Sequence, residues 1–503
     1  MTAIETSGNV AVVGTGTMGQ GIAQVALVAG HPVSLYDAAP GRAEQAAAAI
    51  VRRLDRLVEK GRIQASERDA ARGRLSPATA LADLADARLV IEAILEELPA
   101  KQELFTALEE VVAADCLLAT NTSSLSVTAV AGRLRHPGRC VGLHFFNPAP
   151  LLPLVEVISG FATDEAAATS AYETVAAWGK TPVRCADTPG FIVNRIARPF
   201  YAEALRVYEE RVADPATIDA VLRDGAGFKM GPFELTDLIG QDVNEAVTHS
   251  VWTSFFQDPK FTPSLAQRRL VESGLHGRKS GRGWFDYAEG ARRPEPQTAA
   301  PCPAPEAVGI HAELDGPSEV LRELITEAGI KITRDRTPGE SEGFIRLPGG
   351  ACLALTNGYP ATSVVYGRYI RFDLSLDYRA ATRIALARSE AASEADLAEA
   401  VGLFQALGKQ VSVINDVPGM IVARTVAMIV DFALDAAARG VATPEDIDTA
   451  MRLGVNYPGG PLEWAERLGA QWVWDLLDSM HHQYANGRYA PSWALRRRAD
   501  LQG

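Results

Sequence analysis

Residues 9–19 read Asn-Val-Ala-Val-Val-Gly-Thr-Gly-Thr-Met-Gly, an apolar run that leads directly into a glycine-rich turn. The apolar run predicts a buried β-strand over residues 9–13, and the pattern of residues 20–29 predicts a helix after the turn. Glycines at this spacing, between a strand and a helix, let the backbone approach a pyrophosphate at the helix N-terminus. The stretch therefore predicts a parallel, Rossmann-like sheet that holds a dinucleotide.

A second apolar run, residues 33–36, ends at Asp37. A carboxylate about 20 residues beyond the glycine turn can accept a hydrogen bond from a ribose 2′-hydroxyl and repels a 2′-phosphate. This favours NAD over NADP, although an ordinary turn residue at a strand end would look the same. The cofactor contacts expected from this region are Gly14, Gly16, Thr17, Met18, Gly19 and Asp37.

Three further strands are predicted, each followed by polar residues, at 89–92, 117–120 and 140–143. Ligands gather at the carboxyl ends of parallel strands, so Glu92, residues 121–124 and residues 144–147 are expected to line one crevice. One serine of residues 121–124 could instead cap the next helix.

Residues 141–158 predict a β-hairpin, because two apolar runs flank a proline-containing loop. His144 and Glu156 lie six residues on either side of Pro150, so antiparallel strands that fold back there would place imidazole opposite carboxylate. Such a carboxylate stabilises the imidazolium and equips the histidine to take a proton from an alcohol. A core histidine beside a strand-end glutamate would give the same pattern, and the pair alone does not decide between these interpretations.

Residues 41–81 are rich in Ala and Arg and predict an inserted helical hairpin. Its basic residues crowd one end and are Arg52, Arg53, Arg56, Lys60 and Arg62. Such a cluster indicates either phosphate binding or a solvated helix face.

The composition argues against several classes of partner. The chain has 503 residues and a formal net charge of −13, which disfavours a nucleic-acid or anionic-membrane surface. Its five cysteines show no CxxC spacing, so we expect no disulfide framework, no metal site and a reducing, cytoplasmic location. Neither a signal peptide nor a membrane span is predicted.

The chain repeats itself at an offset of 229 residues. The segment that begins at Asp187 recurs from Asp416 (416 − 187), and Gly231-Pro-Phe-Glu recurs from Gly460 (460 − 231). One ungapped offset over this length indicates a duplication. The proposed catalytic positions are lost in the second copy, where Asn194 becomes Ala423, His144 becomes Asp373 and Glu156 becomes Ala385.

The expected fold is α/β, with a Rossmann-like domain and a helical domain followed by a degenerate second copy of the pair. The expected parts are a NAD-binding domain (1–186), a helical domain (187–290), a proline-rich linker (291–307), a degenerate Rossmann-like domain (308–415) and a second helical domain (416–503). We expect the two helical domains to pair within one chain as a pseudo-dimer, while further homo-oligomerisation stays open.

A set of motifs resembles the L-3-hydroxyacyl-CoA dehydrogenase family over about residues 8–287. The motifs are Gly14-x-Gly-x-Met-Gly, Asn121-Thr-Ser-Ser, Gly142-Leu-His-Phe-Phe-Asn-Pro, Leu154-Val-Glu-Val, Thr188-Pro-Gly-Phe-Ile-Val-Asn-Arg and Gly231-Pro-Phe-Glu. The long duplicated form, with Gly454-Val-Asn-Tyr-Pro-Gly-Gly-Pro near its end, resembles the 3-hydroxyadipyl-CoA dehydrogenases of phenylacetate breakdown. The resemblance implies NAD-dependent oxidation of an L-3-hydroxyacyl-CoA to the 3-oxoacyl-CoA. The expected substrate is 3-hydroxyadipyl-CoA, and the alternatives are 3-hydroxybutyryl-CoA or a general fatty-acid β-oxidation substrate.

The same resemblance implies roles for individual residues. His144 would be the general base and Glu156 its partner, while Ser123 and Asn194 would hydrogen-bond the substrate oxygen and the base. Further contacts with NAD are implied for Glu92, Glu97, Asn147 and Lys279, and a contact with the CoA phosphates for Lys60. Family members often carry Asn at the position of Glu97.

Two other classes of protein share part of this pattern. Nucleotide-sugar dehydrogenases also have two Rossmann-like domains and need a reactive cysteine after a glycine-rich turn. Cys352 follows such a turn, but it runs into a buried-strand pattern with no nearby basic residue predicted to lower its pKa. A non-catalytic NAD-binding scaffold is disfavoured by the intact set of Ser123, His144, Glu156 and Asn194.

Overall fold

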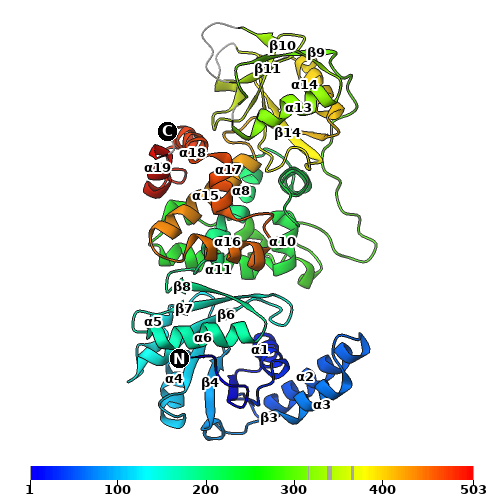
Figure 1. The fold of residues 1–503 in the computed structure, drawn as a ribbon. Helices are drawn as coiled ribbons and strands as arrows, with labels where there is room; N and C mark the ends of the chain where they lie inside the picture. Colours follow the sequence, from blue (N-terminus) through cyan, green and yellow to red (C-terminus); the bar gives the residue numbers. More distant parts are fainter. Residues whose placement is uncertain (1, 315, 337–342, 364–366, 502–503) are drawn as a thin grey trace. The chain divides into compact units, whose positions relative to one another are not determined.

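The computed structural model describes residues 2–314, 316–336, 343–363 and 367–501, and the chain divides into two compact units. The first unit comprises residues 1–195 and 439–455, and the second comprises residues 196–438 and 456–503. Figure 1 shows the ribbon of both units and labels many of their helices and strands.

An eight-stranded sheet forms the centre of the first unit, in the order β3-β2-β1-β4-β5-β6-β7-β8. The strands are β1 (Asn9–Val13), β2 (Val33–Tyr36), β3 (Leu75–Pro77), β4 (Ala87–Glu92), β5 (Leu117–Thr120), β6 (Cys140–Phe145), β7 (Leu154–Ser159) and β8 (Thr181–Ala186). Neighbouring strands are parallel except for the antiparallel pair β6 and β7. The predicted Rossmann-type sheet and the predicted hairpin are both confirmed.

Helices cover both faces of this sheet, because its central strands are apolar on both sides. Val10 and Val12 of β1 belong to one hydrophobic cluster, while Ala11 and Val13 belong to the other. The helices of this part are α1 (Thr17–Val28), α2 (Arg42–Glu59), α3 (Ala65–Gly73), α4 (Leu98–Val111), α5 (Val127–Ala131), α6 (Glu165–Ala177) and α7 (Val193–Ile196), with 3₁₀ turns η1 (Leu81–Leu84) and η2 (Pro137–Arg139). Helices α2 and α3 form the inserted hairpin that the sequence predicted.

A segment from the far end of the chain completes the first unit. Residues 439–455 include helix α16 (Pro444–Val455), which packs on β7 and β8. The backbone N–H of Ala186, on the edge strand β8, donates to Val441 O at 2.8 Å. The first unit is therefore built from two distant parts of the sequence.

The second unit contains two sets of helices. The earlier set is α8 (Arg198–Glu209), α9 (Pro215–Ala220), the π-helical turn η3 (Val221–Gly225), α10 (Pro232–Ile239), α11 (Gln241–Ser254), η4 (Pro259–Phe261), α12 (Leu265–Glu272) and η5 (Arg278–Ser280). The later set is α15 (Val422–Ala438), α17 (Pro461–Leu468), α18 (Ala470–Tyr484) and α19 (Trp493–Asp500). Helix α8 packs on α15, and the buried Glu203 of α8 accepts a hydrogen bond from Arg488 Nη2 at 2.6 Å and one from the Tyr489 hydroxyl at 2.8 Å. Burial opposes ionisation of Glu203, but Arg488 and other arginines outweigh it and leave the pKa of this carboxyl below its ordinary value.

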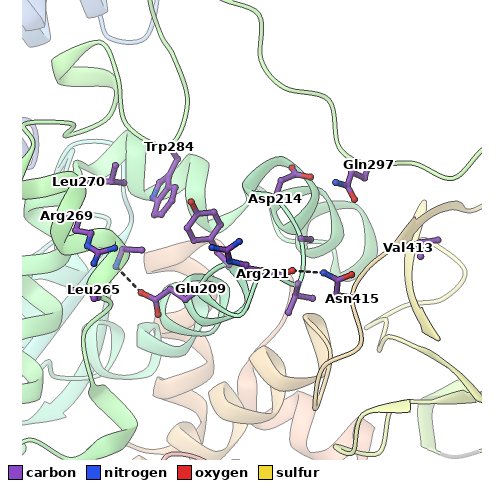
Figure 2. A pocket seen from close by; sticks show the side chains of 14 residues that line it. Glu209, Arg211, Asp214, Leu265, Arg269, Leu270, Trp284, Gln297, Val413 and Asn415 are labelled. Carbon is purple, nitrogen blue, oxygen red and sulfur yellow. Dashed lines mark hydrogen bonds between the residues drawn. The ribbon is translucent and has the colours of Figure 1, made fainter. Parts of the chain in front are cut away.

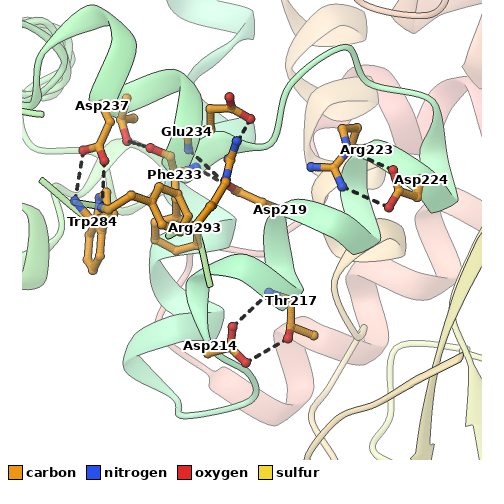
Figure 3. A network of polar contacts seen from close by, with 12 residues as sticks. Asp214, Thr217, Asp219, Arg223, Asp224, Phe233, Glu234, Asp237, Trp284 and Arg293 are labelled. Atoms are coloured by element: carbon orange, nitrogen blue, oxygen red, sulfur yellow. Dashed lines mark hydrogen bonds and ion pairs between the residues drawn. The ribbon is translucent and has the colours of Figure 1, made fainter. Parts of the chain in front are cut away.

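Acidic side chains hold the loops of the earlier helical set together, as Figure 3 shows. Asp219 accepts the N–H of Phe233 at 2.8 Å and that of Glu234 at 2.9 Å, at the start of α10. A Cβ at Gly231 would lie 2.3 Å from Asp219 Cβ, which explains the glycine of the Gly-Pro-Phe-Glu motif. Asp237 accepts the N–H groups of Trp284 (3.0 Å) and Phe285 (2.9 Å). The motif is thus required by packing around α10.

A second, seven-stranded sheet also belongs to the second unit, in the order β10-β9-β11-β12-β13-β14-β15. Its elements are β9 (Ala307–His311), η6 (Gly316–Glu319), α13 (Val320–Glu327), β10 (Lys331–Asp335), β11 (Phe344–Arg346), β12 (Cys352–Leu355), η7 (Ala361–Ser363), β13 (Tyr369–Phe372), β14 (Arg383–Arg388), α14 (Glu394–Ala406) and β15 (Gln410–Val413). Strand β11 is antiparallel to both of its neighbours, whereas no strand of the first sheet has two antiparallel neighbours. Residues 291–306, in the predicted linker, form neither helix nor strand.

One detail of the second sheet corrects the sequence analysis. Cys352 was predicted to have no basic neighbour, but Arg346 Nη1 lies 2.8 Å from its Sγ. The reason is the antiparallel pairing of β11 with β12, which sets Arg346 directly opposite Cys352.

Across the described ranges, none of the helices combines the length and apolar character that crossing a bilayer would need. Within the same ranges, no cluster of three or more His, Cys, Asp or Glu residues is arranged to hold a metal ion.

Candidate active site

The glycine-rich turn between β1 and α1 leaves open space at the helix N-terminus. A Cβ at Gly14 (φ +94°) would lie 2.5 Å from Ala93 O, and one at Gly19 would lie 1.8 Å from Gly14 O, so both positions require glycine. In contrast, nothing lies within 4 Å of a Cβ built at Gly16, the residue that precedes α1 and offers no side-chain cap. These backbone groups fit a bound pyrophosphate.

Asp37 lies at the end of β2 and is tied to the same turn. Its Oδ2 accepts the backbone N–H of Thr15 at 2.9 Å and the Thr15 hydroxyl at 2.7 Å, and its Oδ1 accepts the N–H of Ala39 at 3.0 Å. Burial opposes ionisation of Asp37, but these hydrogen bonds and Arg42 outweigh it and lower the pKa of the carboxyl. An ionised Asp37 beside the glycine turn fits the predicted ribose acceptor.

The hairpin of β6 and β7 brings the predicted base and its partner together. His144 and Glu156 are direct partners in the strand register, and His144 Nδ1 lies 2.6 Å from Glu156 Oε2. Both side chains are buried, and the imidazole contacts the rings of Phe146 and Phe191, with centroid separations of 4.5 and 5.8 Å. A carboxylate at Nδ1 favours the tautomer that donates there, which leaves Nε2 as the basic nitrogen.

The other oxygen of Glu156 fixes the start of α7. Glu156 Oε1 accepts the N–H of Ile192 at 3.0 Å and that of Val193 at 2.9 Å. The next residue is Asn194, whose Nδ2 donates to Ser123 O at 3.4 Å. One carboxylate thus links the base to the segment that carries Asn194.

Sequence reasoning missed Glu96, which organises the loop around Ser123. Its Oε1 accepts the Thr122 hydroxyl at 2.7 Å and the N–H groups of Ser123 and Ser124 at 2.8 and 3.0 Å. Burial opposes ionisation of Glu96, but Lys101 and these hydrogen bonds outweigh it and lower the pKa of the carboxyl. No local sequence pattern predicts this contact, because Glu96 follows β4 while the serines follow β5.

Sequence reasoning also missed Lys101, whose ammonium group contacts the carboxylate of Glu92. The two form a buried ion pair in which Lys101 Nζ lies 2.5 Å from Glu92 Oε1, while Glu92 Oε2 accepts the Thr120 hydroxyl at 2.7 Å. Glu92 is fully buried, and Lys101 also lies 3.2 Å from Glu96 Oε2. The carboxylate of Glu92 therefore supports the ends of β4 and β5 from within, and its contact with a cofactor stays a prediction.

No side-chain hydrogen bond among the described residues joins the other predicted contact residues to this cluster. Glu97, Asn147 and Lys60 are exposed, at the start of α4, in the loop after β6 and at the end of α2. Lys279 belongs to the second unit, where its Nζ lies 2.6 Å from Asp242 Oδ1. Their contacts with NAD or CoA stay predictions.

A cavity of about 960 Å³ in the second unit includes none of the predicted site residues. Figure 2 shows it with Glu209, Arg269, Trp284 and Asn415 among the side chains that line it. It does not bear on the assignment of the predicted site.

The fold and the geometry of the first unit together define a class of protein. A Rossmann-type sheet with an open glycine turn, a carboxylate beside that turn and a buried His–carboxylate pair near a Ser–Asn contact are the features of a nicotinamide-dependent dehydrogenase that acts on alcohols.

Comparisons with known proteins narrow the class. The family profile described as "3-hydroxyacyl-CoA dehydrogenase, NAD binding domain" matches residues 9–188, and the profile of the C-terminal domain matches residues 190–287 and 419–502. A "3-hydroxybutyryl-CoA dehydrogenase reduced Rossmann-fold domain" matches residues 353–418. The chain belongs to the NAD-dependent 3-hydroxyacyl-CoA dehydrogenase family.

Individual relatives agree with the family. The chain is 45% identical to a 3-hydroxyadipyl-CoA dehydrogenase of Escherichia coli K12 over 98% of both chains. It is 41% identical to a 3-hydroxybutyryl-CoA dehydrogenase of Mycobacterium tuberculosis, which covers 55% of this chain and 98% of that protein. A crystal structure of 3-hydroxybutyryl-CoA dehydrogenase from E. coli K12 superposes with a TM-score of 0.89, at 43% identity and 99% coverage of both chains. The nucleotide-sugar dehydrogenase alternative is thereby excluded.

Proposed function

We propose that His144 and Glu156 are the general base and its partner in the oxidation of an L-3-hydroxyacyl-CoA to the 3-oxoacyl-CoA. The observation that carries this proposal is the 2.6 Å contact between His144 Nδ1 and Glu156 Oε2 across paired strands. Nε2 takes the hydroxyl proton, and Glu156 stabilises the imidazolium that forms. Bound NAD supplies the hydride acceptor for this chemistry.

Ser123 and Asn194 hold the substrate oxygen in line with the base in this proposal. Two contacts support a fixed geometry: Asn194 Nδ2 donates to the backbone O of Ser123, and the Ser123 hydroxyl donates to Glu96 Oε1 at 3.3 Å. The glycine turn, Asp37, Glu92, Glu97, Asn147 and Lys279 are proposed to contact NAD, and Lys60 to meet the CoA phosphates. Such positioning accounts for a large part of the rate in bound-substrate reactions.

The proposed substrate is 3-hydroxyadipyl-CoA. Support comes from the full-length relative that bears this name. A terminal carboxylate needs a cation at the far end of its pocket, and the candidates are Arg195, Arg198 and the exposed Lys229. The second candidate substrate is 3-hydroxybutyryl-CoA. A relative with that name matches 55% of the chain, and a solved structure with that name matches 99% of it.

An NADH-formation assay tests both points. We expect a higher kcat/KM with 3-hydroxyadipyl-CoA than with 3-hydroxybutyryl-CoA, and NAD to be preferred over NADP. A higher kcat/KM with 3-hydroxybutyryl-CoA would assign the shorter substrate. If no 3-hydroxyacyl-CoA led to NADH formation, the proposed activity would be overturned.

We also propose that the chain is a degenerate duplication whose halves form a pseudo-dimer. The recurrence of elements at the 229-residue offset supports this: β7 and β14 begin at Leu154 and Arg383, and α6 and α14 begin at Glu165 and Glu394. The left-handed backbone at Phe191 (φ 49°) recurs at Met420 (φ 51°). The C-terminal family profile, which matches two separate stretches, agrees with two copies.

A shortened chain tests the pseudo-dimer. A chain that ends near residue 290 lacks α15, on which α8 packs, so its bare helical surface should cause dimerisation or aggregation. Light scattering would measure this, and a stable active monomer would contradict the proposal.

We further propose a cytoplasmic location, which is supported by the unbridged thiols of Cys116, Cys140 and Cys185.

A further inference from the structure

Gly454 of α16 packs against both backbone segments that hold Glu156. A Cβ built on Gly454 would lie 2.7 Å from Leu154 Cδ2 and 3.0 Å from Val193 Cγ2. Leu154 stands two residues before Glu156 on β7, and Val193 donates its N–H to Glu156 Oε1. Both neighbours are buried, so a larger side chain at residue 454 would have to displace them.

The rest of the segment 439–455 anchors α16 on the sheet edge. The N–H of Ala186 donates to Val441 O at 2.8 Å, and that of Arg184 donates to Asp446 Oδ2 at 3.3 Å. Ile447, Ala450 and Met451 of α16 are fully buried. The helix is therefore fixed against β7 and β8, and movement of its last turn would be transmitted to the strand that carries Glu156.

The second unit contains a matching contact that lacks the catalytic groups. Gly225 of η3 lies 229 residues before Gly454, and its Cβ would lie 3.1 Å from Arg383 O, at the start of β14. The N–H of Asn415 donates to Val212 O at 3.1 Å, which matches the bond from Ala186 to Val441. Strand β14 carries Ala385 where β7 carries Glu156. Gly225 thus offers a control for the packing of such a helix without the base.

We propose that α16, which the second half of the chain contributes, is a positioning element for the catalytic pair. Gly454 lets α16 approach Leu154 and Val193, and this contact sets the Glu156 carboxylate between His144 and the start of α7. Gly454 touches no reacting atom and acts through Glu156, so this inference rests on the proposed roles of His144 and Glu156. Displacement of a positioned base by about 1 Å can cost about 10²-fold in rate.

The test compares Gly454→Val with Gly225→Val in the full chain. We expect Gly454→Val to lower kcat for 3-hydroxyacyl-CoA oxidation by at least about ten-fold, with the Kd of NAD within about two-fold of the wild type. The limb of the kcat–pH profile that reports the base should also shift, because the carboxylate that holds the imidazolium has moved. Gly225→Val should keep kcat within about two-fold of the wild type, even if it lowers the melting temperature as much as Gly454→Val does.

The milder pair Gly454→Ala and Gly225→Ala provides the same comparison if either valine variant does not fold. Alanine is favoured over glycine inside a helix by about 1 kcal/mol, so a lower kcat in Gly454→Ala would not come from helix propensity. An unchanged kcat and pH profile in the Gly454 variants, or equal losses of kcat at both glycines, would overturn the inference. A wild-type protein that forms no NADH would instead overturn the proposed function, so the two failures are distinguishable.

Discussion

Asp373 makes in the second unit the hydrogen bonds that Glu156 makes in the first. Asp373 Oδ2 accepts the N–H groups of Ile421 (3.0 Å) and Val422 (2.8 Å), and these residues lie 229 positions after Ile192 and Val193, whose N–H groups Glu156 accepts. In sequence, however, Asp373 lies 229 positions after His144, directly after the facing strand β13. The carboxylate that fixes the helix start is thus kept while the imidazole is absent. Glu156 therefore has a structural role at α7 in addition to its proposed role at His144.

Glu156→Gln should separate these two roles. The amide oxygen can still accept the N–H groups at α7, but the charge that stabilises the imidazolium is lost. We expect kcat to fall roughly 10²- to 10⁴-fold with a small change in melting temperature. Asp373→Asn is the matched control, and it should leave kcat unchanged. Equal kcat values for Glu156→Gln and the wild type would remove Glu156 from the mechanism.

His144→Ala should strongly slow oxidation while NAD still binds, because the ring acts on the substrate proton and lies on a different strand from the glycine turn. The expected loss is roughly 10²- to 10⁴-fold in kcat. Stopped assays for NADH and calorimetric titration with NAD measure the two quantities. Near-wild-type turnover would show that another group is the base.

Asp37→Ala should weaken the binding of NAD and reduce the preference of the enzyme for NAD over NADP. The substitution removes both the acceptor for the ribose hydroxyl and the charge that repels a 2′-phosphate. It also frees the N–H and hydroxyl of Thr15, so Asp37→Asn, which keeps an acceptor there, is the control for the shape of the turn. The ratio of kcat/KM for NAD and NADP is the measurement. A ratio equal to that of the wild type would count against the role of Asp37.

Asp373 should make the stability of the second unit depend on pH. Burial raises the pKa of Asp373 to about 6, although four backbone N–H groups oppose this shift. The pKa of Asp373 in the folded state lies above the ordinary value of 3.8. Its contribution to the free energy of unfolding is therefore complete below about pH 4 and is lost as the pH rises to about 6. At about 1.4 kcal/mol per pH unit, the loss is roughly 3 kcal/mol. Urea unfolding at pH 4 to 7 measures it, and Asp373→Asn should flatten the dependence; identical curves for both proteins would contradict the assignment.

Each chain should bind one NAD. The sequence that follows β9, Ala312-Glu-Leu-Asp-Gly, contains no counterpart of the Gly14-x-Gly-x-x-Gly19 motif, whose backbone groups would approach a pyrophosphate. Equilibrium titration of the full chain should therefore saturate at one NAD per chain. A stoichiometry of two would show that the second sheet also binds the cofactor.

The sequence by itself determined the elements whose signals are local. The apolar run before Gly14 and the turn chemistry specify β1 and the start of α1, because a strand–glycine turn–helix is one continuous unit. The pairing of His144 with Glu156 was also predictable. A hairpin has a two-residue side-chain period, and the position of its loop then fixes the register.

Only the tertiary structure decided which distant segments support these elements. Glu96 and Ser123 meet because β4 and β5 are neighbours, and Arg184 and Asp446 meet although 262 positions separate them in sequence. Asp373, directly after the opposite strand, replaces the carboxylate of Glu156, and a residue-by-residue alignment at a fixed offset shows this only as the loss of Glu156. Each of these contacts depends on packing between elements that are far apart in the chain, and local propensity and periodicity contain no information about such packing.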